Sequence, residues 1–443
     1  MPVEVISIIG LIAIFLIATV LPVHMGALAL VAAFIVGTTV VGESTDEIVA
    51  GFPGDLFLIL VGVTLLFAIA KDNGTVDWLV HIAVNAVGGR IALIPWVMFA
   101  VTGIITSVGA VVPAAVAIIA PIGMGFALRY RIKPVLMGLM IINGASAGGF
   151  SPLSIFGSIV NGVVERNNLP GSPLLLFLSS MLFNIVLGAV VFVLFGGHAL
   201  LGRRDVGTVM DGADESGTSK GTRASTTMGQ SAPESGAYAP ITTLDRHRIL
   251  TLIGIIGVAI GALVYDLDVG FMAITVAVLL SLAAPNLTKS AVSRVAWSTV
   301  LLICGIVTYV SLMERIGTID YLGNSVARIG SPLVAAVLIC YIGAVVSAFA
   351  STTGILGALI PLAVPFLLTG AVGAVGMVIA LSISSSVVDS SPFSTSGALV
   401  VANSPDDQSD RIFKQLMVWG FSMVAVAPVA TWLIFVVPVW LER

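Results

Sequence analysis

The sequence predicts an all-α polytopic membrane protein, an inverted repeat of two five-helix units that each contain a re-entrant hairpin and a broken transmembrane helix. Three observations support this fold class. Of the 443 residues, 58% are hydrophobic and 9% are charged, with a mean hydropathy of +1.12, whereas about a quarter of the residues in a soluble domain are charged. The two halves share glycine, proline and polar positions in the same order. Polar stretches with proline interrupt apolar segments that are long enough to cross a bilayer.

The first repeat, residues 1–200, begins with scaffold helices. One crossing takes about 20 apolar residues, so the stretch 91–128 is too long for one helix, and Gly109 and Pro113 interrupt it. We interpret it as a re-entrant hairpin, with two full crossings as the alternative. A short segment that begins at Thr75 precedes it and fits an interfacial arm, with Thr75 as the helix cap. The expected elements are scaffold helices within 5–71, the hairpin 91–128, a broken helix 134–165 and a helix 172–200.

The second repeat, residues 248–443, follows the same order. The hexamer GTVDWL at Gly74 recurs as GTIDYL at Gly317, displaced by 243 residues. A nearly constant displacement over many positions is the signature of a duplicated unit. The second unit therefore has its hairpin at 332–369 and its broken helix at 372–402. Further matches are Gly10 with Gly254 and Gly26 with Gly270, displaced by 244, and Ser107, Pro121, Pro152 and Gly157 with Ser347, Pro361, Pro392 and Gly397, displaced by 240.

Residues 201–247 separate the repeats and predict a flexible linker, because a segment so rich in Gly, Ser, Thr and Asp buries too little apolar surface to fold. With five crossings per half and both termini outside, fifteen of the nineteen Lys and Arg residues face the cytoplasm, as the positive-inside rule requires. The linker is then cytoplasmic, and the protein is a multi-pass protein of the cell (inner) membrane. Five is an odd number, so the two repeats cross in opposite senses, an arrangement typical of secondary transporters.

The interrupted crossings are the candidate site. Pro152 and Pro392 lack an N–H and disfavour helix at the preceding residue, so both crossings should break near Ser151 and Ser391. A broken helix exposes N–H groups that attract an anion and carbonyl groups that hold a cation. No Lys or Arg lies in these stretches. An anion would therefore be held by helix dipoles, hydroxyl groups and a cation bound with it.

Asp389 is the strongest single candidate. A carboxylate near the centre of a span costs about 2.5 to 3.5 kcal/mol and usually marks an ion or proton pathway. We expect Asp389 to bind Na⁺ or to take up H⁺, and the alternative is a carboxylate that only caps a half-helix. Asn143 either lines the site or bonds a neighbouring helix. The remaining candidates are the glycines of the first break and the nearby hydroxyl groups: Gly148, Gly149, Ser146, Ser151, Ser154, Ser386, Ser390, Ser391, Ser394 and Thr395.

Several function classes do not fit. The chain has no P-loop and no GxGxxG after a strand, which argues against an ATP-driven pump, and we expect no cofactor beyond the coupling ion. A channel would need a continuous polar pore, and an enzyme would need a base near the serines. The two cysteines are isolated in apolar segments and predict neither a disulfide nor a metal site. The net charge of −4 gives no indication of a nucleic-acid partner.

Two stretches of the first half carry a resemblance, HMGALALVAAF from His24 and FPGDLFLILVGVTLLFAIAKDNGTVDWLV from Phe52. With them the first half resembles the MatC family of dicarboxylate (malonate) carriers. More broadly, the hairpins and interrupted crossings are similar to the ion transporter superfamily, which includes the divalent-anion/sodium symporters and carries a Ser-Asn-Thr motif at each hairpin tip. The residues Ser351, Thr352 and Thr353 match this motif with Thr in place of Asn. The corresponding first-half residues, Val111 to Pro113, do not match.

This resemblance implies a cation-coupled symporter of small dicarboxylates, of the malonate or C4 type, that lies in the lipid bilayer as a homodimer. It also implies an elevator movement of the hairpins and broken helices against a scaffold. Transport of another organic or inorganic anion, such as gluconate, is the alternative on the same fold, and an anion channel is the more distant one.

Overall fold

The computed structural model describes residues 2–76, 78–79, 82, 90–203, 244–265, 267–318, 321, 331–349, 352–405 and 407–441. Within these ranges the regular elements are helices and none is a strand. Six of the helices are long and apolar enough to cross a membrane, so the chain is an all-α, multi-pass membrane protein, as predicted. Most of the predicted linker and of the arm after Thr75 lies outside the described residues.

The first half contains α1 (Val3–Val20), α2 (Met25–Val36), α3 (Thr45–Ala50), α4 (Gly54–Asp72), α6 (Ile94–Ser107), α7 (Val112–Tyr130), α8 (Pro134–Gly148), α9 (Ile155–Arg166) and α10 (Pro173–Leu194). The second contains α11 (Arg246–Val264), α12 (Val269–Ala283), α13 (Pro285–Thr288), α14 (Trp297–Arg315), α16 (Pro332–Phe349), α17 (Thr352–Leu368), α18 (Ala374–Val387), α19 (Thr395–Ala402), α20 (Ser409–Thr431) and α21 (Val437–Leu441).

Local sequence chemistry places several helix starts. Proline occupies the first turn of α6, α7, α8 and α10, where its missing N–H costs no hydrogen bond. At α3, Ser44 and Glu47 form a capping box: the Ser44 N–H donates to Glu47 Oε2 at 2.7 Å, and the Glu47 N–H donates to Ser44 Oγ at 3.3 Å. The hydrogen bonds that the Ser44 N–H and Ser44 Oγ donate to Glu47 Oε2 hold the pKa of the Glu47 carboxyl below its ordinary value.

One cap differs from the prediction. Asn73, not Thr75, is the capping side chain before the predicted arm. Asn73 Oδ1 accepts hydrogen bonds from the Thr75 N–H at 3.0 Å and from Thr75 Oγ1 at 2.6 Å. Asparagine is as good a cap as threonine or better, and its position two residues earlier lets it reach both groups.

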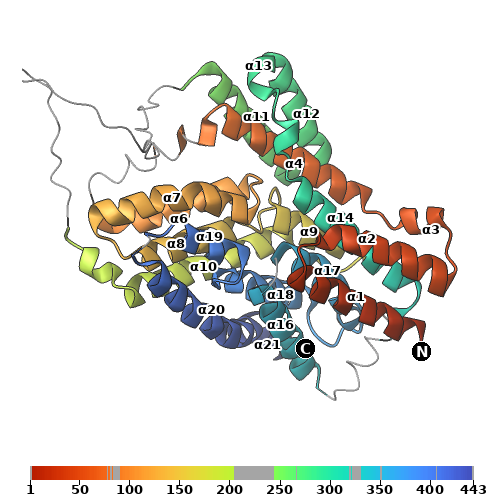
Figure 1. Cartoon of the computed structure of the whole chain (residues 1–443). Coiled ribbons are helices and arrows are strands. Elements are labelled where there is room, and N and C mark those ends of the chain that lie inside the picture. Colours follow the sequence, from red (N-terminus) through yellow and green to blue (C-terminus); the bar gives the residue numbers. More distant parts are fainter. Residues whose placement is uncertain are drawn as a thin grey trace, which may run out of the picture.

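The helices fall into two groups (Figure 1). We call α1–α4 with α11–α14 the scaffold unit, and α6–α10 with α16–α20 the site unit. The predicted hairpin ranges contain α6 with α7 and α16 with α17, and the predicted broken helices contain α8 with α9 and α18 with α19. The two units meet where α4 packs on α9 and where α14 packs on α17. The re-entrant placement of the hairpins in a bilayer stays a prediction.

Inside the scaffold unit, helices of one half pack against helices of the other half. The second helix of each half packs against the fourth helix of the other half, α2 against α14 and α12 against α4. Glycine allows both contacts: a Cβ on Gly305 would lie 2.0 Å from the carbonyl oxygen of Gly26, and a Cβ on Gly62 would lie 2.6 Å from that of Gly270. Gly26 and Gly270 are repeat partners in the sequence, so the same contact is built twice, once from each half.

Helices α2 and α14 run parallel to each other, and so do α4 and α12. At the start of α2 and α14, His24 Nε2 lies 2.9 Å from Ser298 Oγ, and after their ends Arg315 Nη2 donates to Glu43 Oε2 at 2.8 Å. In the other pair, Gly62 in the middle of α4 contacts Gly270 near the start of α12. The end of α4 then meets the segment after α12, where Ser290 Oγ donates to Asp72 Oδ2 at 3.2 Å.

Candidate functional site

The two broken helices have the same local geometry. In the first, Ser154 caps α9, and its Oγ donates to the carbonyl oxygens of Gly149 and, at 2.6 Å, Ser151. In the second, Ser394 caps α19, and its Oγ donates to the carbonyl oxygens of Asp389 at 2.5 Å and Ser391 at 2.6 Å. Serine therefore closes each break by bonding backwards to carbonyl groups that the ended helix leaves free.

Each break also depends on a glycine one turn into the new helix. A Cβ on Gly157 would lie 2.0 Å from the carbonyl oxygen of Ser151, and a Cβ on Gly397 would lie 1.9 Å from that of Ser391. No side chain fits at such a distance. The matching positions of these glycines in the sequence thus reflect a shared backbone path.

One difference between the breaks is a charge: at one aligned position the first has Gly149 and the second has Asp389. Asp389 is 2% exposed, and its Oδ2 accepts a hydrogen bond at 2.5 Å from the hydroxyl of Ser396, the second residue of α19. None of the ion pairs among the described residues includes Asp389. A single buried carboxylate therefore lies at the amino end of α19, where the helix dipole favours negative charge.

The second break packs against the helix that leads into the first break. The turn that contains Asp389 (Val388–Ser390) and helix α19 both pack against α8. In the first half, Ser151 Oγ donates to the carbonyl oxygen of Ser107 at 2.8 Å, which ties the break to the end of α6. In the second, Ser347 Oγ and Thr352 Oγ1 lie 2.9 Å apart between α16 and α17. The hydroxyl pair thus lies where the sequence places a hairpin tip.

The structure buries most of the predicted site residues. Thr395 is exposed on α19, and Ser351 lies outside the described residues. Two of the buried hydroxyls bond to the preceding turn of their own segment, Ser386 to the carbonyl oxygen of Ile383 and Ser390 to that of Val387. The buried residues are Asn143, Ser146, Gly148, Gly149, Ser151, Ser154, Thr352, Thr353, Ser386, Asp389, Ser390, Ser391 and Ser394.

Helix α10 adds polar groups that the sequence reasoning missed. Ser180 Oγ donates to the carbonyl oxygen of Ser146 at 3.3 Å, and Asn184 Nδ2 donates to the carbonyl oxygen of Ser180 at 2.9 Å. Among the described residues, Asn143 Nδ2 and Asn184 Oδ1 are buried without a hydrogen-bond partner. The one signal in the sequence is the spacing of Ser180 and Asn184, four apart on one face of an otherwise apolar helix.

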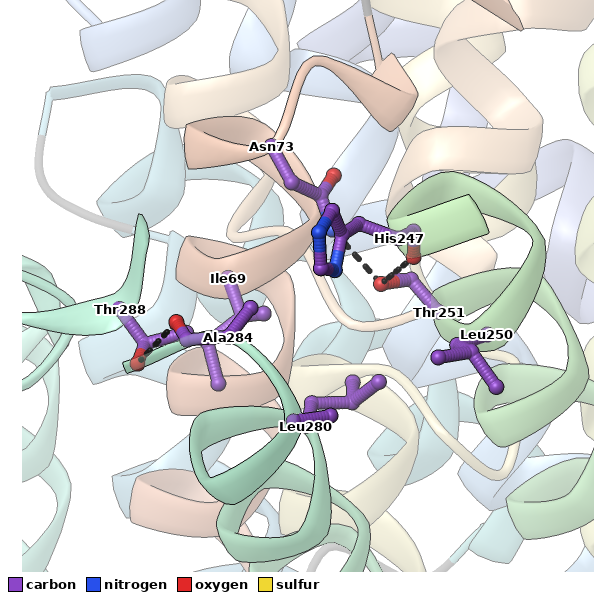
Figure 2. A pocket seen from close by; sticks show the side chains of 9 residues that line it. Ile69, Asn73, His247, Leu250, Thr251, Leu280, Ala284 and Thr288 are labelled. Carbon is purple, nitrogen blue, oxygen red and sulfur yellow. Dashed lines mark hydrogen bonds between the residues drawn. The ribbon is translucent and has the colours of Figure 1, made fainter. Parts of the chain in front are cut away.

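A separate pocket lies in the scaffold unit, between the end of α4, the start of α11 and the end of α12 (Figure 2). Its volume of about 10 Å³ is enough for one water. Asn73 Nδ2 donates to Thr251 Oγ1 at 2.6 Å, and Thr251 Oγ1 donates to the carbonyl oxygen of His247 at 3.0 Å. None of the predicted site residues lines it, so we assign it to packing between the halves.

The comparisons with known proteins match each half separately. Residues 1–149 match the family model described as the N-terminus of the dicarboxylate carrier protein MatC. Residues 269–441 match the family model described as citrate transporter. A search of the curated proteins found none that matches the chain. The second match covers α19 and both partners of the Asp389–Ser396 hydrogen bond.

Proposed function

Since these matches identify a membrane transporter of the MatC dicarboxylate-carrier and citrate-carrier type, and not an enzyme, we propose that the protein carries small dicarboxylates coupled to Na⁺ or H⁺. The proposed cargo is of the malonate or C4 type. The observation that carries the proposal is the pair of helix breaks capped in the same way by Ser154 and Ser394, the second of which holds the buried carboxylate of Asp389.

Charge balance supports the coupling. The amino ends of α9 and α19 offer N–H groups and a positive dipole to a carboxylate. Asp389 already places a negative charge at the end of α19, and no cationic side chain forms an ion pair with it in the described part of the chain. A dianion would be repelled unless Asp389 is protonated or bound to a cation. Co-transport of H⁺ or Na⁺ therefore makes cargo binding favourable.

Apart from Asp389, the ligands of a metal ion at this site would be neutral oxygen atoms. The described residues contain no group of three or more His, Cys, Asp or Glu suited to a metal ion. Na⁺ would take Asp389 together with hydroxyl and carbonyl oxygens, such as those of Ser390, Ser391 and Thr352. Hard cations accept such oxygen ligands.

The scaffold geometry supports an inverted repeat with elevator movement. Helix α14 runs parallel to α2, and its repeat counterpart α4 is the next membrane helix after α2. Successive crossings run in opposite directions, so α14 and α4 would cross in opposite senses. In this proposal both termini lie outside, the linker is cytoplasmic, the site unit moves against the scaffold unit, and two copies of the chain form a homodimer.

Uptake into proteoliposomes tests this function. Labelled malonate, succinate and citrate would be offered with Na⁺ and pH gradients imposed separately, and with gluconate as a competing anion. We expect saturable uptake of at least one dicarboxylate that depends on one of the two gradients. Uptake that depends on neither gradient would contradict the coupling, and a lack of uptake of both malonate and succinate would rule out the proposed dicarboxylate cargo.

A further inference from the structure

Three ion pairs occur among the described residues, and one of them joins the two units. Glu43 with Arg315 and Asp72 with Arg294 both lie within the scaffold unit. The third pairs Asp55, in the first turn of α4, with Arg166, the last residue of α9. Among these ion pairs, only this one must break if the site unit moves against the scaffold unit.

The geometry of the pair is specific. Arg166 Nε donates to Asp55 Oδ2 at 3.0 Å, and Arg166 Nη2 bonds to Asp55 Oδ1. Such two-point contacts are stronger and more directional than single ones. Beside the pair, Leu56 contacts Gly162, where a Cβ would lie 2.7 Å from a Leu56 methyl group. The ion pair thus lies over a close helix contact that also crosses the boundary.

Another boundary contact is of a different kind. Between α14 and α17, Gly354 and Gly357 face the apolar side chains of Leu302, Ile303 and Ile306. Apolar contacts are not directional, so small residues can slide along such a surface at low cost. A bidentate ion pair fixes one position, and this makes the Asp55–Arg166 contact specific to one arrangement of the units.

We propose that the Asp55–Arg166 ion pair is a latch that holds the site unit at one end of its movement. The proposal rests on the elevator movement proposed above. The Asp55 side chain is 52% exposed and the Arg166 side chain is 30% exposed. Both charges therefore stay in contact with water when the ion pair opens, and opening leaves no charge buried. Exposed pairs are modest in strength and weakened by salt, which suits a contact that must open in every transport cycle.

Cross-linking tests the latch without measuring transport. In a chain with Cys304→Ala and Cys340→Ala, the substitutions Leu56→Cys and Gly162→Cys place two thiols across the boundary. We expect Arg166→Gln to lower the yield of this disulfide by about two- to fivefold, the range for an exposed ion pair. A pair within the scaffold unit, Gly37→Cys with Ile48→Cys, which lie in contact, should give the same yield with and without Arg166→Gln.

Charge exchange and a matched ion pair give the second test. Asp55→Arg combined with Arg166→Asp should restore the wild-type cross-linking yield, and Arg315→Gln, which breaks the Glu43 pair inside the scaffold unit, should leave it unchanged. An unchanged yield in Arg166→Gln would overturn the latch. If the oxidised Leu56→Cys/Gly162→Cys chain transports as fast as the reduced chain, the boundary does not move and the latch is also overturned. That result would leave coupled uptake by the wild-type chain unaffected. The latch can therefore be refuted while the proposed transport function is kept.

Discussion

At the scale of single residues, the position shared by Gly149 and Asp389 distinguishes the two repeats by a charge. At both breaks the Oγ of the capping serine donates to the carbonyl oxygen of this residue and to that of the serine two residues later, so the carboxylate is not needed to build the break. Its Oδ2 accepts a hydrogen bond from the hydroxyl of Ser396, and none of the ion pairs among the described residues includes it. A buried charge that the fold does not require is best explained by a role in binding.

The first prediction follows from this difference. Asp389→Asn keeps the size and a hydrogen-bond acceptor for Ser396 but removes the negative charge and the site of protonation. We expect coupled dicarboxylate uptake to fall at least tenfold and the remaining uptake to lose its dependence on the Na⁺ or pH gradient. Asp268→Asn is the matched control, because Asp268 caps α12 outside the site unit and asparagine caps equally well. Full uptake with unchanged ion dependence in Asp389→Asn would refute the assignment.

The second prediction concerns the glycine of the second break. Gly397→Ala puts a methyl carbon 1.9 Å from the carbonyl oxygen of Ser391, so the backbone of the break must shift. We expect uptake to fall tenfold or more while the protein still inserts and purifies, because the strain is local. Gly257→Ala, on α11 in open space, should transport as the wild type does. The measurement is initial uptake rate per folded protein; equal rates in the two variants would show that the break tolerates the shift.

At the scale of helices, close glycine contacts join the halves in the scaffold unit. The backbones of α2 and α14 approach so closely at Gly26 and Gly305 that neither position accepts a side chain. Small residues at such crossings let van der Waals contacts form in lipid, where the hydrophobic effect does not drive helices together. The scaffold unit is therefore stabilised by backbone proximity more than by large side chains.

The third prediction tests this contact. Gly305→Ala places a Cβ 2.0 Å from the carbonyl oxygen of Gly26, and overpacking of this kind costs about 1 to 3 kcal/mol. We expect a lower midpoint of thermal unfolding in detergent. Gly125→Ala, on α7 with no atom near the added methyl group, should unfold at or above the wild-type midpoint. A Gly305→Ala midpoint equal to that of the wild type would mean that α2 and α14 separate easily.

Sequence reasoning predicted these elements best where a signal is local. Pro152 and Pro392 are sufficient to place the breaks, because proline restricts its own residue and the one before it. The partners of the break could not be predicted, because they depend on packing between distant segments. Ser180 is an example, because it reaches the carbonyl oxygen of Ser146 near the end of α8 from α10. In the scaffold unit, the bond from Asn73 to Thr251 of the other half could not be predicted for the same reason.

At the scale of the whole molecule, the repeat predicts an orientation. The excess of Lys and Arg predicts that the linker lies in the cytoplasm and that the acidic loop around Asp46 lies outside. If the repeats are inverted, these two segments lie on opposite sides of one membrane. The linker position Ser216 and the loop position Asp46 are suitable for labelling, because neither belongs to a predicted site.

The fourth prediction is a labelling pattern. In a chain with Cys304→Ala and Cys340→Ala, Asp46→Cys should react in intact cells with a maleimide that does not cross membranes. Ser216→Cys should react with it only after the cells are opened. Both should react equally in detergent, which controls for reactivity of the thiols. The reverse pattern would invert the assigned orientation, and reaction of both in intact cells would rule out a cytoplasmic linker.

The packing of α2 and α4 against helices of the other half has a consequence for biogenesis. Helix α2 packs against α14, and α4 packs against α12. Until the chain beyond the linker has been synthesised, the contact surfaces of α2 and α4 at Gly26 and Gly62 therefore face lipid. The protein should mature only after translation has finished. A gene cut at the linker should yield stable protein when both fragments are produced together, and fragments that are rapidly degraded when each is produced alone.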